Sequence, residues 1–522
     1  MTNPLFKFLS KNYSKIAMIL ILAVAAFYRL YQISDYMTFL GDEGRDVLVA
    51  YNILHGDLTL LGPTASVGGF FLGPIYYYFM APFLWIFNYN PVGPAVMVAL
   101  FGIATVWLIY KIGKEFFGTP VGLIASALYA ISPLVVTYSR SSWNPNPMPF
   151  FSLLTLYATY KALAKNSAKL FVISGFLFGI AMQLHYLALF LGAIILAYIL
   201  LYWFVFSKKN FLKLIKQYAY VLIGFVIGWS PFLAFEVRHG FMNTTSIFKF
   251  IFHSKDINGG GAFFDIVGGV FFRVFGRLTL NFPSYEKFPM WSSLGIGFWN
   301  YATYLLGTAC LAFLIYKCFK EYKKRSLDFA KFSLLSLWLI LGVCLFGFYK
   351  KSIYDYYFGF IFPLPFLIVG VFIKSLWQKR IGKILSVLLL ILLVWLNNLT
   401  PPYKDSANGQ LSQTEEISKF VVSKTKQEPF NFALITAGNS DHAYRYFFTV
   451  WGREPVTIQN PTIDPQRKTV MSQLLVVCET SAPCEPLGNS LWEIAGFGRA
   501  EIAEEWSFSV VKVFRLTHYK GK

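Results

Sequence analysis

The stretch Lys169–Phe206, KLFVISGFLFGIAMQLHYLALFLGAIILAYILLYWFVF, carries no Lys, Arg, Asp or Glu after its first residue. About 20 apolar residues are enough to cross a bilayer, so this run is too long for one membrane helix. The more polar Gln183–Tyr186 marks a break in it. The stretch therefore predicts two consecutive spans, 169–185 and 187–206.

The rest of the chain repeats this pattern of apolar runs and short charged loops. Of its 522 residues, 56% are hydrophobic and only 14% are charged, whereas soluble domains carry about 25% charged residues. The composition excludes an ordinary soluble protein and predicts a polytopic α-helical membrane protein with about eleven spans. The predicted spans are 16–33, 91–110, 120–138, 147–164, 169–185, 187–206, 217–235, 296–316, 332–349, 357–375 and 382–399.

The basic residues lie mainly between these spans and predict an orientation. The formal net charge is +20, but its distribution follows the positive-inside rule, so we expect membrane lipids and no nucleic acid as partners. The rule places the N-terminus in the cytoplasm. The clusters on that side are Lys111/Lys114, Lys161/Lys165/Lys169, Lys208/Lys209/Lys213/Lys216, Lys317/Lys320/Lys323/Lys324/Arg325 and Lys374/Lys379/Arg380/Lys383.

The first apolar run, 16–33, follows three lysines, as in a secretory signal peptide. No small-x-small cleavage site ends the run, and Arg29 and Tyr31 lie near its far end. We therefore expect it to be retained as the first span of a protein of the plasma (inner) membrane.

An odd number of spans leaves the C-terminal region outside the cytoplasm. We expect a membrane domain, 1–399, with outer loops at 34–90 and 236–295, and a small extracytoplasmic α/β domain at 400–522. Cys478 and Cys484 form a disulfide if this region is outside the cytoplasm and are otherwise two free thiols. The expected strands are Phe432–Thr436 and Leu474–Cys478, and the expected helices are Thr414–Lys424 and His442–Trp451.

The aromatic segment Ile75–Phe87 predicts a helix that lies along the lipid headgroups. The alternative is a twelfth span. It would reverse the orientation of every later span and place the basic clusters outside, so we reject it.

The first candidate site is Gly41-Asp42-Glu43-Gly44-Arg45-Asp46, directly after the first span. Glycine on both sides of Asp42–Glu43 lets the backbone approach a ligand closely. Two adjacent carboxylates repel each other, which raises the proton affinity of one of them and suits a general base. We predict Asp42 and Glu43 as catalytic residues; the alternative is a solvated loop with ordinary surface acids.

Three further polar stretches, Tyr138–Asn146, Glu236–Gly240 and Tyr349–Tyr357, lie at predicted outer span ends. Arginine and lysine suit phosphate, and tyrosine faces suit sugar rings. Interfacial anchoring, a Glu236–Arg238 pair and contact with lipid headgroups are the alternatives. The predicted donor-phosphate contacts are Arg140, Arg238, Lys350, Lys351 and Tyr354, and the predicted substrate contacts are Tyr76, Tyr77, Asn144, Glu236 and His239.

The order of these features resembles the GT-C superfamily of polytopic glycosyltransferases, in particular the branch of protein O-mannosyltransferases and aminoarabinose transferases. One span comes first, followed by the acidic motif. Gly73–Tyr77 is similar to the family's Pro-Leu-Tyr-Tyr-like segment, and Ser132-Pro133 with Tyr138-Ser139-Arg140 to its Ser-Pro…Tyr-Ser-Arg segment. Leu72-Gly73-Pro74 replaces the usual His-Pro-Pro, so no role is carried over for that histidine.

The resemblance implies an inverting transfer of a hexose or pentose from a polyprenyl-phosphate sugar donor to a protein, lipid or polysaccharide acceptor. It places the catalytic acid on Asp42, with Glu43 in support, and a phosphate-contacting arginine on Arg140. It implies no required metal, although some GT-C members use a divalent one. No third acid is convincingly placed to bind a metal, with Glu236 as the remaining candidate, so we expect no cofactor and leave a divalent metal as the unsupported alternative. The alternative function is a transporter or flippase of a lipid-linked glycan, which would need ionisable residues in mid-span and a repeat between halves.

Overall fold

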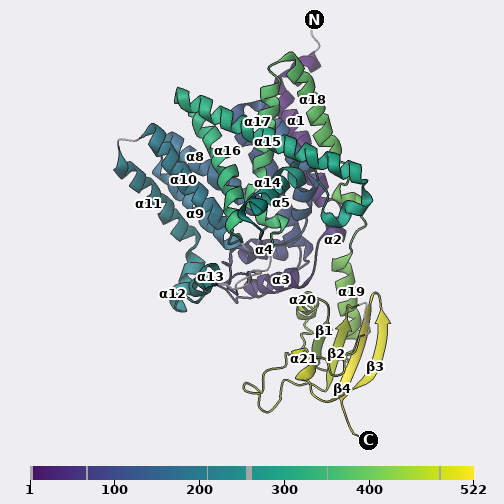
Figure 1. The fold of residues 1–522 in the computed structure, drawn as a ribbon. Helices are drawn as coiled ribbons and strands as arrows, with labels where there is room; N and C mark the ends of the chain where they lie inside the picture. Colours follow the sequence, from purple (N-terminus) through teal and green to yellow (C-terminus); the bar gives the residue numbers. More distant parts are fainter. Residues whose placement is uncertain are drawn as a thin grey trace. The chain divides into compact units, whose positions relative to one another are not determined.

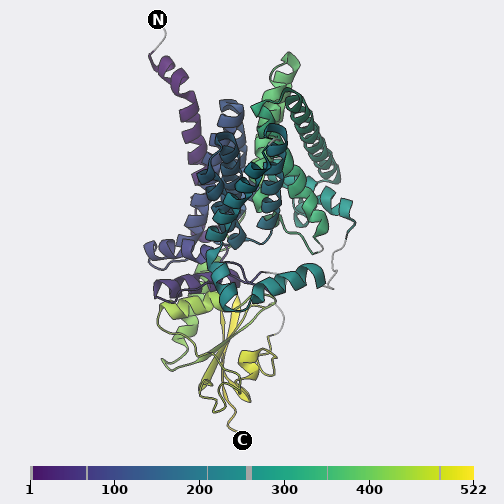
Figure 2. The same cartoon turned by 90° about the vertical axis from the view of Figure 1, so that its left-hand side faces the viewer.

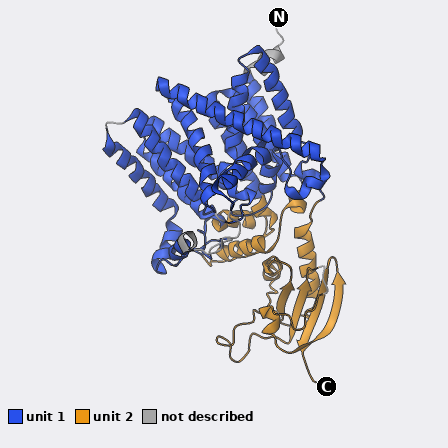
Figure 3. Ribbon diagram, viewed as in Figure 1, with its two compact units in different colours: residues 1–31, 59–76, 96–406 blue, residues 32–58, 77–95, 407–522 orange. Residues whose placement is uncertain are grey.

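The computed structural model describes residues 4–65, 69–207, 210–253, 261–349, 351–480 and 484–521. The chain forms two compact units (Figure 3). Unit 1 comprises residues 1–31, 59–76 and 96–406, and unit 2 comprises residues 32–58, 77–95 and 407–522. The acidic motif 41–46 thus belongs to the same unit as the C-terminal residues. The predicted division of the chain at residue 400 stays a prediction.

Long apolar helices make up most of unit 1 and run alongside one another (Figure 1, Figure 2). Within the described ranges, seven helices are long and apolar enough to cross a membrane, or eight if one bent pair is a single span. The polytopic helical fold predicted from the apolar runs is confirmed. These helices are α1 (Pro4–Leu30), α5 (Val92–Phe117), α10 (Ala188–Phe206), α11 (Phe211–Gly228), α15 (Ser293–Lys324), α16 (Leu327–Cys344) and α18 (Arg380–Asn397).

The chain also contains shorter helices. The segment predicted to lie along the headgroups forms α4 (Ile75–Ile86), whose 12 residues rise only about 18 Å. That length is too short for a span of its own. Two further helices, α8 (Met148–Lys165) and α9 (Ala168–Leu184), lie between α5 and α10 in the sequence, where spans were predicted.

Three predicted spans are interrupted near a proline. Proline lacks the N–H donor and its ring clashes with the preceding turn, so a helix continues past it only with a kink. Pro133, Pro231 and Pro363 each lie in the first turn of a new helix. The resulting pairs are α6 (Thr119–Ile131) with α7 (Pro133–Tyr138), α11 with α12 (Ser230–Arg238), and η3 (Asp355–Ile361) with α17 (Pro363–Leu376), the last bent by 58°.

The predicted outer loop 236–295 is largely helical. It contains α13 (Met242–His253), α14 (Phe263–Thr279) and the 3₁₀ helix η1 (Tyr285–Met290). Val274, Phe275 and Leu278 are buried on one face of α14, which packs against α15, α17 and the 3₁₀ helix η2 (Leu345–Phe348). This helix positions two arginines of the site described below.

Helices α9 and α11 pack with their backbones in contact because glycines face each other. Gly175 and Gly179 of α9 lie opposite Gly224 and Gly228 of α11. A methyl group added at any of these positions would overlap backbone atoms of the other helix. Two small-xxx-small pairs of this kind are typical of closely packed membrane helices.

Unit 2 contains a four-stranded mixed sheet of order β1-β2-β4-β3, in which β1 pairs parallel with β2 and the other pairs are antiparallel. The predicted strands and helices of the C-terminal region are confirmed within a few residues. The elements are α19 (Gln410–Ser423), β1 (Asn431–Ile435), α20 (His442–Val450), β2 (Gln473–Cys478), α21 (Trp492–Ala495), β3 (Ala500–Phe508) and β4 (Val511–His518). The short η4 (Pro402–Lys404) precedes them and belongs to the last residues of unit 1. Cys478 and Cys484 form a disulfide.

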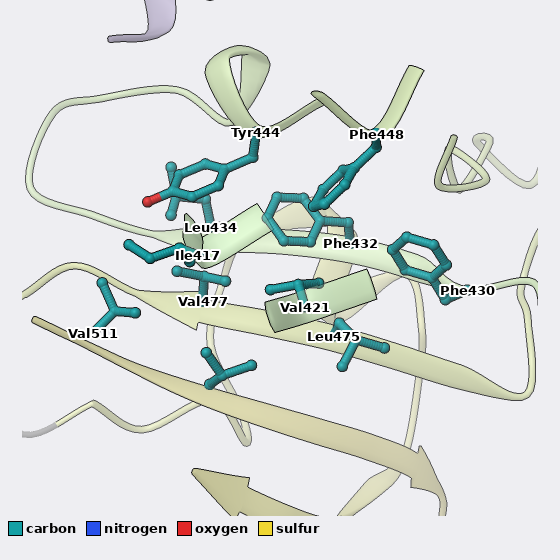
Figure 4. Packing of buried hydrophobic residues seen from close by; sticks show 11 residues of the cluster. Ile417, Val421, Phe430, Phe432, Leu434, Tyr444, Phe448, Leu475, Val477 and Val511 are labelled. Atoms are coloured by element: carbon teal, nitrogen blue, oxygen red, sulfur yellow. The ribbon is translucent and has the colours of Figure 1, made fainter. Parts of the chain in front are cut away.

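Both faces of the central strand β2 are buried. On one face α19 and α20 pack Ile417, Tyr444 and Phe448 onto Leu475 and Val477 (Figure 4). A second cluster, which includes residues of α21, covers the other face. The sheet thus packs against α20, which in turn packs against α3 (Gly41–Leu54).

The chain between the first span and α3 is also tied to this sheet domain. It forms the short helix α2 (Ile33–Tyr36), and the carbonyl of Asp35 accepts a hydrogen bond from the Gly409 N–H at 3.0 Å. The Phe39 N–H donates to Gln410 Oε1 at 3.1 Å. These bonds fix the start of α3 relative to α19.

Candidate functional site

The acidic motif is the first turn and a half of helix α3, not a loop as its two glycines suggested. Leu40 is extended, and α3 begins at Gly41. Glu43 Oε2 accepts a hydrogen bond from the Leu40 N–H at 3.1 Å, which satisfies a donor that would otherwise lack a partner at the helix start. Glu43 is only 7% exposed. The side chain therefore caps the helix.

Burial changes the acidity of Glu43. Loss of hydration raises its pKa to about 7, and the charges of Asp46 and Asp42 add to this effect, while the bond from Leu40 opposes it. The expected repulsion between carboxylates is present, but desolvation is the largest cause.

Asp42 has the opposite environment. Its side chain is 57% exposed, and Oδ1 accepts a hydrogen bond from Arg45 Nη1 at 2.9 Å. Arg45 also reaches Asp46 Oδ1 through Nε at 3.0 Å and Nη2 at 2.7 Å. One guanidinium thus orients two carboxylates, one open to solvent and one buried.

Asp46 is the last residue of the motif quoted as the first candidate site, but no role was predicted for it. It is fully buried, and desolvation raises its pKa to about 6 against the opposing effect of Arg45. Tyr77, predicted as a substrate contact, interacts with both Asp46 and Arg45, and burial raises its pKa. Had the segment been predicted as a helix, the spacing of four residues would have placed Asp42 and Asp46 on the same face.

We expected the two glycines of the motif to let a ligand approach the backbone, but the residues close to them belong to the segment 439–443 of the same chain. A methyl group at Gly41 would overlap Ser440, and one at Gly44 would overlap the backbone of His442 and Ala443. The Gly41 N–H donates to Asn439 Oδ1 at 2.8 Å. The segment 439–443, before and at the start of α20, therefore lies directly on the first turn of α3.

In unit 1, three predicted site residues fix the turn that follows α7. Arg140 is 2% exposed, and its Nη2 donates to the Tyr31 carbonyl at 2.6 Å. The buried Asn144 Nδ2 donates to the Leu184 carbonyl at 2.6 Å. The Tyr76 and Ser142 hydroxyls share a hydrogen bond of 2.7 Å. Their roles toward substrate stay predictions.

The end of α12 carries three more predicted residues. Glu236 is buried and accepts hydrogen bonds from the N–H groups of Asn243 at 3.1 Å and Thr244 at 2.7 Å, at the start of α13. Arg238 and His239 are exposed, and the His239 ring stacks on Phe235 at 4.0 Å. Glu236 thus caps a helix, as Glu43 does in unit 2.

Aromatic side chains surround the predicted Tyr349–Tyr357 stretch. Tyr354 is 55% exposed and stacks on Tyr356 at 5.8 Å, and Tyr356 lies 4.4 Å from Trp143. Lys351 is half-buried. Lys350 lies outside the described residues. The cluster offers ring faces of the kind that sugars stack on.

Arg273 and Arg277 of α14 meet Asp355, and neither arginine was predicted. Arg273 Nε donates to Asp355 Oδ1 at 2.9 Å, and Arg277 Nη2 lies 2.9 Å from Asp355 Oδ2. The two arginines are one helical turn apart, which puts them on the same face. The sequence analysis treated 236–295 as a loop; a helix predicted there would have placed Arg273 and Arg277 on the same face.

Unit 1 contains two cavities near the end of α14, and the first of them is lined by members of this ion pair. The first, of about 270 Å³, is lined by polar and aromatic side chains that include Arg277, Lys287, Asn281, Tyr138, Trp291 and Asp355. The second, of about 730 Å³, is lined almost wholly by apolar side chains of α15, α17 and α18. Consecutive residues line the two cavities: Leu280 and Phe298 the apolar one, and Asn281 and Trp299 the polar one. Together they form a polar space next to an apolar one.

Solved structures of two membrane proteins share this architecture. ArnT from Cupriavidus metallidurans in the apo state is 11% identical, with a TM-score of 0.58, and the match covers 97% of this chain and 98% of that chain. ArnT bound to undecaprenyl phosphate gives 12% identity and a TM-score of 0.58 over 95% and 97% of the two chains. The Archaeoglobus fulgidus oligosaccharyltransferase AglB, in complex with an inhibitory peptide and a dolichol-phosphate, gives 14% identity and a TM-score of 0.55 over 90% and 70%. The fold is the GT-C fold. The predicted resemblance is confirmed.

The sequence match to the GT-C proteins is more local than the match in fold. Residues 72–235 match the family model of dolichyl-phosphate-mannose-protein mannosyltransferases. This range contains Tyr76, Arg140 and Asn144 but neither the acidic motif 41–46 nor the C-terminal region. No curated protein sequence matches the chain.

Metal-binding side chains are not clustered in the part of the chain that the structure describes. No group of three or more His, Cys, Asp and Glu residues among the described residues is placed to hold a metal ion.

Proposed function

We propose that this protein is a membrane glycosyltransferase that moves a sugar from a polyprenyl-phosphate-linked donor to an acceptor on the extracytoplasmic face. The GT-C fold supports this proposal, as do the ligands of the two similar structures, undecaprenyl phosphate in ArnT and dolichol-phosphate in AglB. The acceptor is a protein, a lipid or a polysaccharide.

The observation that carries the proposal is the pair of adjoining cavities in unit 1. A polyprenyl-phosphate sugar is an anionic, polar head on a long hydrocarbon chain. The polar cavity offers Arg277 and Lys287 to the phosphate and Tyr138 and Trp291 to the sugar ring. The apolar cavity offers aliphatic and aromatic walls to the first isoprene units.

Asp42 is the proposed general base. Arg45 occupies its Oδ1, and the exposed carboxylate keeps Oδ2 for the acceptor. Oδ2 removes the proton of the acceptor hydroxyl while the acceptor oxygen forms a bond to the anomeric carbon from the face opposite the phosphate. The bond from that carbon to the phosphate oxygen breaks, and the electron pair leaves with the phosphate, so the configuration inverts. Arginine and lysine side chains stabilise the charge that develops there.

The proposed orientation keeps the N-terminus in the cytoplasm of a cell with a plasma (inner) membrane. Lys323 and Lys324 in the last turn of α15 and Arg325 after it belong to the basic residues of the cytoplasmic side. The acidic motif and unit 2 then face outward.

Donor binding tests the cavity assignment directly. Protein in nanodiscs is titrated with radiolabelled undecaprenyl phosphate, and Arg277→Gln is compared with wild type and with Arg325→Gln, a matched control at the C-terminal end of α15. A hydrogen bond to a charged group contributes about 1.5–3 kcal/mol, so Arg277→Gln weakens binding by roughly tenfold or more. Binding that Arg277→Gln leaves unchanged would remove the donor from this cavity. In a second assay with a radiolabelled polyprenyl-phosphate sugar, transbilayer movement of the label without transfer would favour a flippase.

A further inference from the structure

Two arginines of α14 converge on one carboxylate of the polar cavity. Asp355 Oδ1 accepts hydrogen bonds from Arg273 through Nε at 2.9 Å and Nη2 at 2.5 Å. Asp355 Oδ2 accepts a hydrogen bond from Arg277 Nε at 3.1 Å and lies 2.9 Å from its Nη2. Two planar guanidinium groups thus direct four nitrogen donors at a single oxyanion, an arrangement that suits a phosphate group as well as a carboxylate.

Each arginine is also held by a group other than the carboxylate. Arg273 Nη1 donates to the Ile353 carbonyl at 2.7 Å, and its guanidinium lies 4.7 Å from the centre of an aromatic ring of η3. Arg277 Nη1 donates to the Phe282 carbonyl at 3.2 Å. Because these contacts do not involve Asp355, we expect both guanidinium groups to stay oriented when its charge is removed.

The acids of the polar cavity limit how strongly it can hold an anion. Arg277 and Lys287 line the cavity, and so do Asp355 and Asp405. Lys287 Nζ lies 3.4 Å from Asp405 Oδ2, so both cations face a carboxylate of the same wall. A phosphate in this cavity needs the Arg277 donors that Asp355 occupies, and two anions so close together repel each other. The Asp355 carboxylate and a bound phosphate are therefore alternative partners of the arginines.

The charge of the lipid phosphate rises during the proposed reaction. A polyprenyl-phosphate sugar is a phosphodiester with a single negative charge, and loss of the sugar leaves a phosphomonoester of about −1.5 to −2 at pH 7. The arginines by themselves would hold this product more tightly than the donor. A carboxylate that competes for the same donors lowers the affinity for the product and speeds its release.

We propose that Asp355 is an internal competitor of the lipid phosphate, and that its return to Arg273 and Arg277 promotes release of the polyprenyl phosphate product. This inference rests on the proposed function and assigns product release to a residue of the donor cavity. Its signature is a gain in affinity when the carboxylate is neutralised. A carboxylate that served only to hold the arginines would have the opposite effect, because its loss would loosen them and weaken binding.

The test measures binding of radiolabelled undecaprenyl phosphate to the full chain in nanodiscs. Asp355→Asn removes the charge with little change in shape. It lowers Kd by about tenfold, mostly through slower dissociation in a chase with unlabelled lipid. Asp355→Glu keeps the charge and does not tighten binding. Asp265→Asn makes the same change of charge at an exposed position of α14 and alters Kd by less than about twofold, because solvent screens it.

Asp355→Ser is a second neutral variant, in case the asparagine variant does not fold, and the same gain is expected from it. Equal or weaker binding by the neutral variants, together with weaker binding by Arg277→Gln, would overturn the inference and leave the donor cavity in place. Equal tightening by Asp265→Asn would also overturn it, because the effect would then be one of overall charge. Binding that Arg277→Gln leaves unchanged would instead refute the cavity assignment of the proposed function, and the inference with it.

Discussion

Replacing Glu43 by glutamine removes a buried charge and keeps the helix cap. Glutamine at this position can still accept the hydrogen bond from the Leu40 N–H, as glutamate does at 3.1 Å. The two side chains differ little in volume. The effect of the substitution on stability therefore comes mainly from ionisation.

The magnitude follows from the shift in acidity. Burial raises the pKa of Glu43 from 4.5 to about 7, and at about 1.4 kcal/mol per unit this shift corresponds to about 3 kcal/mol. Since the folded-state pKa is raised, the folded protein binds the proton more tightly than the unfolded chain does. Stability is then greatest below pH 4.5 and falls as the pH rises through about 7.

The assay is thermal unfolding in nanodiscs at pH 5 and pH 8.5. Glu43→Gln unfolds about 6–12 °C higher than wild type at pH 8.5, since 1 kcal/mol shifts Tm by about 2–4 °C in a unit of this size. At pH 5, where most of the destabilisation by the ionised carboxylate has not yet developed, its gain is only about 2–3 °C. Glu454→Gln, at an exposed position of unit 2, shows no such pH-dependent gain. A Glu43→Gln variant that is equally or less stable than wild type at pH 8.5 would refute the reasoning.

Three further substitutions test the packing. Gly44→Ala places a methyl group on the backbone of α20 and lowers the Tm of unit 2 by the equivalent of about 1–3 kcal/mol. Gly268→Ala, whose methyl group would point into open space, leaves Tm unchanged, and equal Tm values for the two variants would contradict the close approach of α3 and α20. Gly224→Val separates α11 from α9 and makes both more accessible to hydrogen exchange, and unchanged protection would argue against the glycine contact. Cys484→Ser removes the disulfide to Cys478 and costs about 2 kcal/mol, seen as a lower unfolding midpoint that reducing agent no longer changes.

The membrane fold could be predicted because the length and polarity of a span are local properties of the sequence. The run Lys169–Phe206 forms two helices that break at His185, close to where its polar residues predicted. The buried strands of unit 2 were also recognisable, since β1 and β2 are short apolar runs. Prolines that divide spans were visible as well, but whether such a helix kinks or stops depends on its neighbours.

The site was harder to predict because it depends on contacts between distant residues. Gly41 and Gly44 indicate a loop when read locally, yet they form a helix because α20 packs on them. Arg273 and Arg277 make α14 too polar to be recognised as a span, and their partner Asp355 follows about eighty residues later. Asp42 was predicted from its pairing with Glu43 and from the family resemblance, whereas the contacts of Asp46 became visible only with the helix.

The most direct test of the central claim is single-turnover transfer from a radiolabelled polyprenyl-phosphate sugar by purified protein, with Asp42→Asn against wild type. Asp57→Asn, in the same unit, serves as the control. We predict that wild type and the control transfer the label to the acceptor and that Asp42→Asn lowers the transfer rate by about 10²–10⁴-fold with donor binding retained, which is the usual contribution of a general base. Transfer by Asp42→Asn at the wild-type rate would contradict the account.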